Sequence, residues 1–136
     1  MPKKTANNYT FAVGRRKAAS ATVKLFFGKG DSHVNELSAD KYFPGNEDQS
    51  IYNHPFLATD TLGKYYFTAR ISGGGKKGQL EALQLAIARA LQKSNQAVFT
   101  SLLRGQGLLT VDSRVKERRM VGTGGKARRQ KQSPKR

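Results

Sequence analysis

The chain of 136 residues contains no cysteine, and this absence excludes three kinds of site at once. Disulfides, zinc centres with thiolate ligands and cysteine nucleophiles all require a thiol. Histidine is nearly absent as well, since only His33 and His54 occur, in different segments and without an ordered set of carboxylates beside them. Isolated histidines are far more common as surface or packed residues than as a two-histidine metal site. The sequence therefore predicts no metal centre.

Long apolar runs are missing too. No segment approaches the roughly 18 apolar residues of a membrane span, and residues 1–11 lack the apolar core of a secretory signal. The serines and threonines are scattered, and no G-x-S-x-G motif or comparable nucleophile arrangement is present. These absences predict a cytoplasmic protein that is not an enzyme, that spans no membrane, and that has neither a cofactor nor a small-molecule substrate.

Acidic residues are scarce, with 9 of them against 25 Lys and Arg, and the net charge is +16. The imbalance is greatest in residues 114–136, which hold ten Lys or Arg, a single acid, Glu117, and almost no large apolar residue after Val121. A segment of this composition repels itself in water and cannot bury enough apolar surface to fold alone. A polyanion would neutralise it, so nucleic acid is the first partner to expect.

The rest of the chain has enough large apolar residues for a core and is predicted to form one domain of ordinary size. Its charge is uneven, because residues 1–30 contain seven basic residues and no acid, whereas residues 31–60 contain six acids and only Lys41. The sequence thus predicts a globular body, residues 1–113, with one side facing a polyanion, followed by an extended basic tail, residues 114–136.

Alternating β-formers predict strands over residues 9–13, 20–27 and 65–72. In the second and third strands the alternation predicts that these apolar side chains share one face of their strand: Ala21, Val23, Leu25 and Phe27, and Tyr65, Phe67, Ala69 and Ile71. A short strand within residues 32–35 and a small helical or irregular piece near residues 39–43 are also expected. Residues 44–61 carry several turn-forming residues, and the sequence leaves their structure open.

Apolar residues at spacings of three and four predict a helix over residues 79–94, with this stripe facing the sheet: Leu80, Leu83, Ile87 and Leu91. A second, shorter helix is expected over residues 96–103, ending near a glycine. Several strands followed by two helices predict an α+β fold, in which a mostly antiparallel sheet has both helices packed on one face.

A glycine-rich segment separates the third strand from the long helix, and its sequence, Gly73-Gly74-Gly75-Lys76-Lys77-Gly78, fits G-x-G-x-x-G. A dinucleotide site would also need an acid about 20 residues further on and a returning parallel strand, and a P-loop would need Lys followed by Ser or Thr. The sequence has neither set of features, so both kinds of nucleotide site are disfavoured. One remaining interpretation is an anion site, where backbone N–H groups and the charges of Lys76 and Lys77 attract an RNA phosphate. The other is a tight turn that glycine merely permits.

The basic run Arg15-Arg16-Lys17 interrupts two strands, so it is predicted to lie at a turn or strand end with its charges projecting together. Contact with phosphate is favoured over a merely solvated run of charge. Two aromatic groups, Tyr42-Phe43 and Tyr65-Tyr66-Phe67, could stack on bases. Aromatic residues in alternating strands are more often part of the core, and that interpretation is favoured here.

Four separated blocks resemble the family of the ninth protein of the small ribosomal subunit, which is present in all ribosomes: Gly14-Arg15-Arg16-Lys17, Ser72-Gly73-Gly74-Gly75 with Gly78-Gln79, Ile87-Ala88-Arg89-Ala90-Leu91, and Ala127-Arg128-Arg129 with the terminal Lys135-Arg136. The blocks cover nearly the whole chain in order, and the ending is similar to the bacterial branch. The resemblance implies an α+β body in the head of the small subunit, bound to 16S-type ribosomal RNA beside neighbouring head proteins. It also implies a tail that threads through RNA toward the peptidyl site.

Together, charge pattern and resemblance predict contacts with ribosomal RNA at Arg15, Arg16, Lys17, Lys76, Lys77, Arg114, Lys116, Arg118, Arg119, Lys126, Arg128, Arg129 and Lys131. The resemblance further implies that Lys135 and Arg136 touch the backbone of peptidyl-site transfer RNA. The tail, residues 114–136, reaches about 80 Å when fully extended, which allows a contact far from the body. This chain departs from the bacterial pattern in having Pro134 before the last two residues and no aromatic residue near them.

Two other functions fit parts of the sequence. A free basic nucleic-acid-binding or RNA-chaperone protein would account for the charge but not for the four blocks. Its affinity for nucleic acid would fall steeply as the salt concentration rises and would show little sequence preference. A small nucleotide-dependent enzyme would rest on the glycine-rich segment alone, and nucleotides would then raise its melting temperature.

Overall fold

Five strands form one sheet in the order β1-β2-β5-β3-β4 in the computed structural model, which describes residues 9–122. The strands are β1 (Tyr9–Arg16), β2 (Ala19–Phe27), β3 (His33–Val34), β4 (Leu37–Ser38) and β5 (Tyr65–Ser72). Every pair is antiparallel except β3 with β5, which is parallel. The predicted α+β class and the mostly antiparallel sheet are confirmed.

The period-two pattern of β2 and β5 gives the sheet one buried face. Val23 pairs with Ala69 and Leu25 with Phe67 across the two strands, and all four side chains are buried. The predicted apolar faces are thus confirmed except at the end of β2, where Phe27 is 78% exposed. Phe27 follows the alternation, but no element of the described chain covers this strand end.

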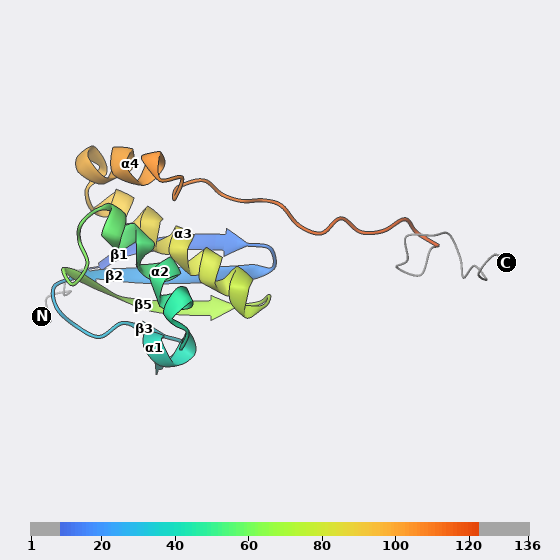
Figure 1. Ribbon diagram of the computed structural model, residues 1–136, viewed down its shortest axis with the longest axis horizontal. Helices are drawn as coiled ribbons and strands as arrows, with labels where there is room; N and C mark the ends of the chain where they lie inside the picture. The colour runs from blue at the N-terminus through green and yellow to red at the C-terminus, as the bar shows by residue number, and fades with distance from the viewer. Residues whose placement is uncertain (1–8, 123–136) are drawn as a thin grey trace, which may run out of the picture.

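Three helices lie on the buried face of the sheet: α2 (Asn46–Ala58), α3 (Lys76–Ser94) and α4 (Gln96–Gly105). Figure 1 shows α3 crossing the sheet over β1 and β2, with α2 beside it, and α4 packs against α3. The fourth helix, α1 (Ala39–Tyr42), is a single turn next to β3 and β4. The two predicted helices, α3 and α4, are confirmed, whereas α2 was not predicted.

Helix α3 approaches β1 closely because Gly14 has no side chain. A Cβ at this position would overlap the backbone of α3, at the carbonyl oxygen of Ala82 and the amide nitrogen of Ala86. Both helix residues are alanines that are themselves fully buried. Small residues on the two elements therefore set the distance between helix and sheet, and with it the position of the N-terminal end of α3.

Helix α2 occupies the region that the sequence left open, and it contains Pro55 in its last turn. Proline lacks the N–H group that would bond to the carbonyl oxygen four residues earlier. That oxygen, on Ile51, instead accepts a hydrogen bond of 3.1 Å from the side-chain amide of Gln84 on α3. Tyr52 and Phe56 pack against Phe67 of β5, with ring centroids 6.1 and 6.3 Å away. Tertiary contacts thus stabilise a helix that local sequence does not favour.

Two backbone carbonyl oxygens of β1, the outer strand of the sheet, accept hydrogen bonds from cationic side chains of α3. Arg89 donates from Nη1 to the oxygen of Val13 at 2.9 Å, and Lys93 donates from Nζ to the oxygen of Phe11, also at 2.9 Å. Edge strands otherwise offer such groups to other chains. These two cations are consequently held by the body of the protein.

After α4 the chain passes Leu108, which is buried in the core, and then leaves the body. Residues 110–120 belong to neither a helix nor a strand, and Figure 1 shows them running away from the sheet and helices in an extended course. None of the helices within residues 9–122 combines the length and apolar character that crossing a bilayer requires.

Candidate nucleic-acid interface

The turn between β1 and β2 lies directly against the glycine-rich turn that follows β5. Gly73 has a φ of +78°, and a Cβ there would meet the carbonyl oxygen of Ala18. The neighbouring Gly74, with a φ of +63°, packs on Ala19 in the same way. Only glycine fits such positions without strain. The glycines thus bring Lys17, between the first two strands, close to the beginning of α3.

The first two residues of α3 are Lys76 and Lys77, and both side chains are exposed. The helix therefore begins three residues earlier than predicted, and these lysines belong to its first turn rather than to a loop. The first N–H groups of a helix have no partner within it, and the helix dipole favours anions there. Two cations in the same turn add to that attraction.

Side-chain hydrogen bonds hold the glycine-rich turn in place. Gln79 donates from its side-chain amide to the carbonyl oxygen of Gly73 at 3.0 Å, and the hydroxyl of Tyr42 donates to the other end of the same amide at 2.8 Å. A dinucleotide-binding unit would return from the helix to a parallel strand. In the described chain α3 is followed by α4, with no strand after it. The geometry suits a phosphate of a polymer better than a nucleotide cofactor.

Arg16 does not project with its neighbours, contrary to the prediction for the Arg15-Arg16-Lys17 run. Its guanidinium turns back to the body, where Nε donates to Glu81 at 2.6 Å and Nη1 donates to the carbonyl oxygen of Arg114 at 2.8 Å. Its side chain is only 12% exposed, whereas Arg15 and Lys17 are exposed. The alternation of β1 explains the difference, since Arg16 points to the side of the sheet that carries α3.

Asp112 joins this group of side chains from the segment that follows α4. One of its oxygens lies 3.3 Å from Nη1 of Arg16, and its carboxylate receives hydrogen bonds of 2.9 and 2.7 Å from the guanidinium of Arg114. The hydrogen bonds from Arg114, together with the charge of Arg16, hold the pKa of Asp112 well below its usual range. Residues 112–114 are thereby fastened beside the β1–β2 turn.

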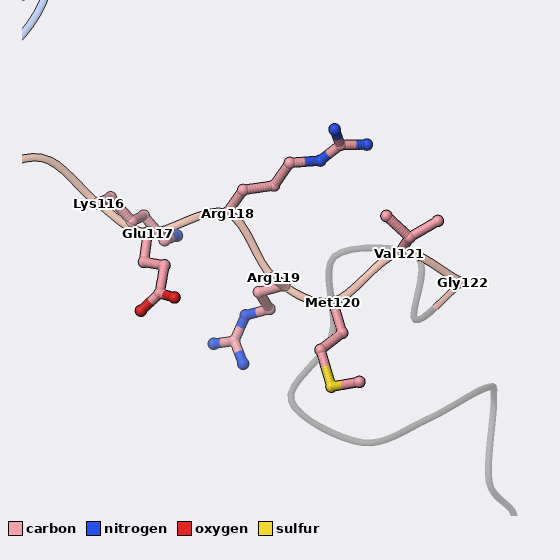
Figure 2. Close-up of a pocket in the computed structure, with 7 residues that line it drawn as sticks. All are labelled: Lys116, Glu117, Arg118, Arg119, Met120, Val121 and Gly122. Atoms are coloured by element: carbon pink, nitrogen blue, oxygen red, sulfur yellow. The ribbon is translucent and has the colours of Figure 1, made fainter.

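Beyond this point the predicted contacts Lys116, Arg118 and Arg119 are all exposed. Figure 2 shows Arg118 on one side of the extended backbone and Arg119 on the other. Among residues 9–122, the hollow of about 460 Å³ in this view is lined by the consecutive residues 116–122 and by none of the helices or strands, so no part of the described body encloses it. Cations on both sides suit a chain surrounded by a polyanion rather than one lying on its surface.

The structure therefore gathers four predicted cations, Arg15, Lys17, Lys76 and Lys77, at one end of the body, beside the start of the basic tail. Six further predicted residues lie outside the described part of the chain: Lys126, Arg128, Arg129, Lys131, Lys135 and Arg136. Residues 9–122 contain no cluster of His, Asp and Glu that could hold a metal ion.

Two exposed cations that the sequence interpretation did not select, Lys24 and Arg70, lie on the face of the sheet opposite the helices. The signal for them was present in the alternation of β2 and β5. A residue between two core positions of a strand points to the other face, so both cations could have been assigned to that face from the sequence.

The family model described as ribosomal protein S9/S16 matches residues 14–136. The small ribosomal subunit protein uS9 of Leifsonia xyli is 45% identical over 125 residues, which cover 92% of this chain and 74% of that protein. The protein of the same name from Porphyromonas gingivalis is 44% identical over 129 residues, covering 95% of this chain and 99% of its own length. That from Dehalococcoides mccartyi is 40% identical over 116 residues, or 85% and 87% of the two chains.

Proposed function

The chain belongs to the ribosomal protein S9/S16 family, a family of ribosomal structural proteins rather than enzymes, and we propose that it is built into the head of the small subunit by binding 16S-type ribosomal RNA. In this proposal it lies beside neighbouring head proteins, in the ribosome of the cytoplasm, and takes part in translation. Its C-terminal residues Lys135 and Arg136 reach the backbone of peptidyl-site transfer RNA.

One observation carries the RNA-binding part of this proposal. Arg15, Lys17, Lys76 and Lys77 come from two segments far apart in the sequence, yet they meet at one end of the body. Within residues 9–122 none of the four forms an ion pair, while the nearby Glu81 and Asp112 are already paired with Arg16. An unbalanced group of cations next to a helix N-terminus favours a phosphate backbone.

The basic tail, residues 114–136, extends this surface in the proposal. Arg114, Lys116, Arg118 and Arg119 form its first part, and the residues beyond the described chain continue it with Lys126, Arg128, Arg129 and Lys131. Phosphate contacts of this kind position a protein on RNA without reading its sequence. The body, residues 1–113, then fixes where the tail starts, and the tail supplies more than half of the excess charge.

Arg16 has a distinct place in this proposal. Its Nε and Nη1 atoms are bonded to Glu81, Asp112 and the backbone of Arg114. Contact between RNA and Arg16 stays a prediction. The bonds to Asp112 and Arg114 support a further role, in which Arg16 holds the start of the tail beside the exposed cations of the β1–β2 turn.

The experiment that tests the proposal is sedimentation of a cell extract through sucrose gradients at moderate and at high salt, with this chain followed across the fractions. We expect it to migrate with the small subunit in a one-to-one ratio at both salt concentrations. Migration at the top of the gradient, or release by modest salt, would instead favour the free nucleic-acid-binding protein, whose contacts are purely electrostatic.

A further inference from the structure

We propose that the face of the sheet opposite the helices binds an unpaired segment of RNA, with Lys24 and Arg70 on its phosphates and aromatic side chains beside its bases. This inference rests on the proposed function and adds a second contact surface to it. The surface, called the open face below, is formed by outward residues of three adjacent strands, among them Tyr9 of β1, Lys24 and Phe26 of β2, and Tyr66, Thr68 and Arg70 of β5.

The open face is a consequence of the strand register. Lys24 pairs with Thr68, and Thr22 pairs with Arg70, each flanked by core residues that point to the helices. All of the helices that contact β1, β2 and β5 do so on the buried side, as the fully buried alternate residues show (Figure 1). Lys24, Thr68 and Arg70 are exposed, so within residues 9–122 nothing covers the middle of this face.

An aromatic row borders the open face. The rings of Phe26 and Tyr66 are stacked, with centroids 5.0 Å apart and planes inclined by 10°, and Tyr9 adds a third ring 5.7 Å from Phe26. Cross-strand aromatic pairs stabilise a sheet, but this row is only half-buried and lies outside the core. Lys24 places its Nζ atom 5.1 Å from the centre of the Tyr9 ring. A cation beside partly exposed rings is a pairing that single-stranded nucleic acid can use, with stacking for bases and charge for phosphates.

A hollow of about 650 Å³ lies next to this row, and Thr22, Lys24, Thr68 and Arg70 line it on the sheet. Its size is within the range of sites that enclose a small ligand, so a nucleotide unit fits. Asn35 forms one wall, and its side-chain amide exchanges two hydrogen bonds of 2.8 Å with the backbone of Ile71. The wall is therefore fixed in place. Threonine hydroxyls between two cations offer donors and acceptors to a ribose or a base edge.

Charge and shape together favour unpaired RNA over the alternatives. Neither Lys24 nor Arg70 forms an ion pair within residues 9–122, and the one acid at the hollow, Glu36, leaves a net positive charge. A duplex shields its bases, so it could not use the aromatic row, whereas a single strand exposes them. A protein partner would need to supply acids opposite both cations.

The test uses the full chain and two probes, an unstructured eight-nucleotide oligouridine and the complete small-subunit ribosomal RNA. Ultraviolet cross-linking to oligouridine, followed by peptide mapping, shows where the RNA lies. We expect cross-links in peptides that contain Phe26 and Tyr66, besides those in the tail. In the double variant Lys24→Gln/Arg70→Gln these open-face cross-links should fall about tenfold, because two single-strand phosphate contacts are lost.

The matched control is Lys41→Gln/Arg104→Gln, which removes the same charge from two exposed helical positions, one on α1 and one on α4. Melting temperatures of both variants should equal that of the unaltered protein, since all four side chains are on the surface. Cross-links confined to the tail and the β1–β2 turn, or an equal loss in both double variants, would overturn the open-face proposal and leave the proposed function standing. Failure of the unaltered protein to bind ribosomal RNA would overturn the proposed function itself.

Discussion

The guanidinium of Arg16 lies 3.3 Å from a carboxylate oxygen of Asp112, and this ion pair joins the end of the first strand to the segment that follows the last helix. The same guanidinium contacts Glu81 on α3 at 2.6 Å. Three parts of the chain thus converge on one side chain, which we call the Arg16 cluster. The direction in which residues 114–122 leave the body depends on it.

Replacing Arg16 by Gln should lower the free energy of unfolding by about 1.5 kcal/mol, because a half-buried, charge-assisted set of hydrogen bonds is lost and part of it is screened by water. It should also speed tryptic cleavage after Arg114 and Lys116, since the segment is no longer held. Arg15→Gln, at the exposed neighbouring position, is the control. Equal cleavage rates in the two variants would contradict a tethering role for Arg16.

The ion pairs of Asp112 should make the stability of the protein depend on pH at the acid end. The pKa of Asp112 is lowered in the folded state, chiefly by the hydrogen bonds from Arg114. A lowered pKa contributes stability above the unfolded value, near pH 4 for aspartate, and that contribution disappears as pH falls through the folded pKa. Asp112→Asn should therefore be less stable at pH 7 and match the unaltered protein at the lowest pH. A constant difference from pH 7 downward in urea titrations would refute this assignment.

Gly14→Ala should destabilise the protein by about 3 kcal/mol, because the new methyl group would force α3 away from β1. Thermal or urea unfolding measures the loss. The control is Gly105→Ala, since nothing lies within 4 Å of a Cβ there and the backbone needs no positive φ. That variant should be as stable as the unaltered chain or slightly more so. Similar effects at both positions would mean that close packing at Gly14 is not the cause.

The three longer strands, β1, β2 and β5, and helix α3 could be predicted because each has a strong periodic pattern within its own segment of the sequence. Helix α2 was not, since Pro55 and the flanking glycine and proline oppose a helix, and the contact that compensates, from Gln84, comes from another helix. The cations of the candidate interface could be listed from charge alone. Their grouping could not, because it depends on the packing of Gly73 and Gly74 against Ala18 and Ala19, which no local pattern encodes.

Lys76 and Lys77 should contribute to RNA affinity through charge. In the double variant Lys76→Gln/Lys77→Gln, the slope of log affinity for ribosomal RNA against log salt should decrease by about 1.4 to 1.8, as two phosphate contacts are lost. Filter binding over a range of salt concentrations gives this slope. Lys41→Gln/Lys64→Gln carries the same change of charge at exposed positions elsewhere. An identical slope change in that control would assign the effect to net charge alone.

Deleting Pro134–Arg136 should leave assembly into small subunits unchanged and weaken the binding of transfer RNA in the peptidyl site. The deletion removes only two of the ten tail cations, so most contacts with ribosomal RNA remain. Subunits that contain the shortened chain can be isolated and their transfer RNA affinity compared with that of complete subunits. Unchanged affinity would exclude Lys135 and Arg136 as transfer RNA contacts.

The hydrogen bonds from Arg89 and Lys93 to the outer strand have a consequence for the protein before it meets RNA. A newly made copy carries an uncovered strand edge, and such edges recruit other chains into aggregates. With the carbonyl oxygens of Phe11 and Val13 already bonded, a second molecule finds fewer free acceptors with which to continue the sheet at these positions. The long helix that forms the core thereby also disfavours pairing between unassembled copies along this edge.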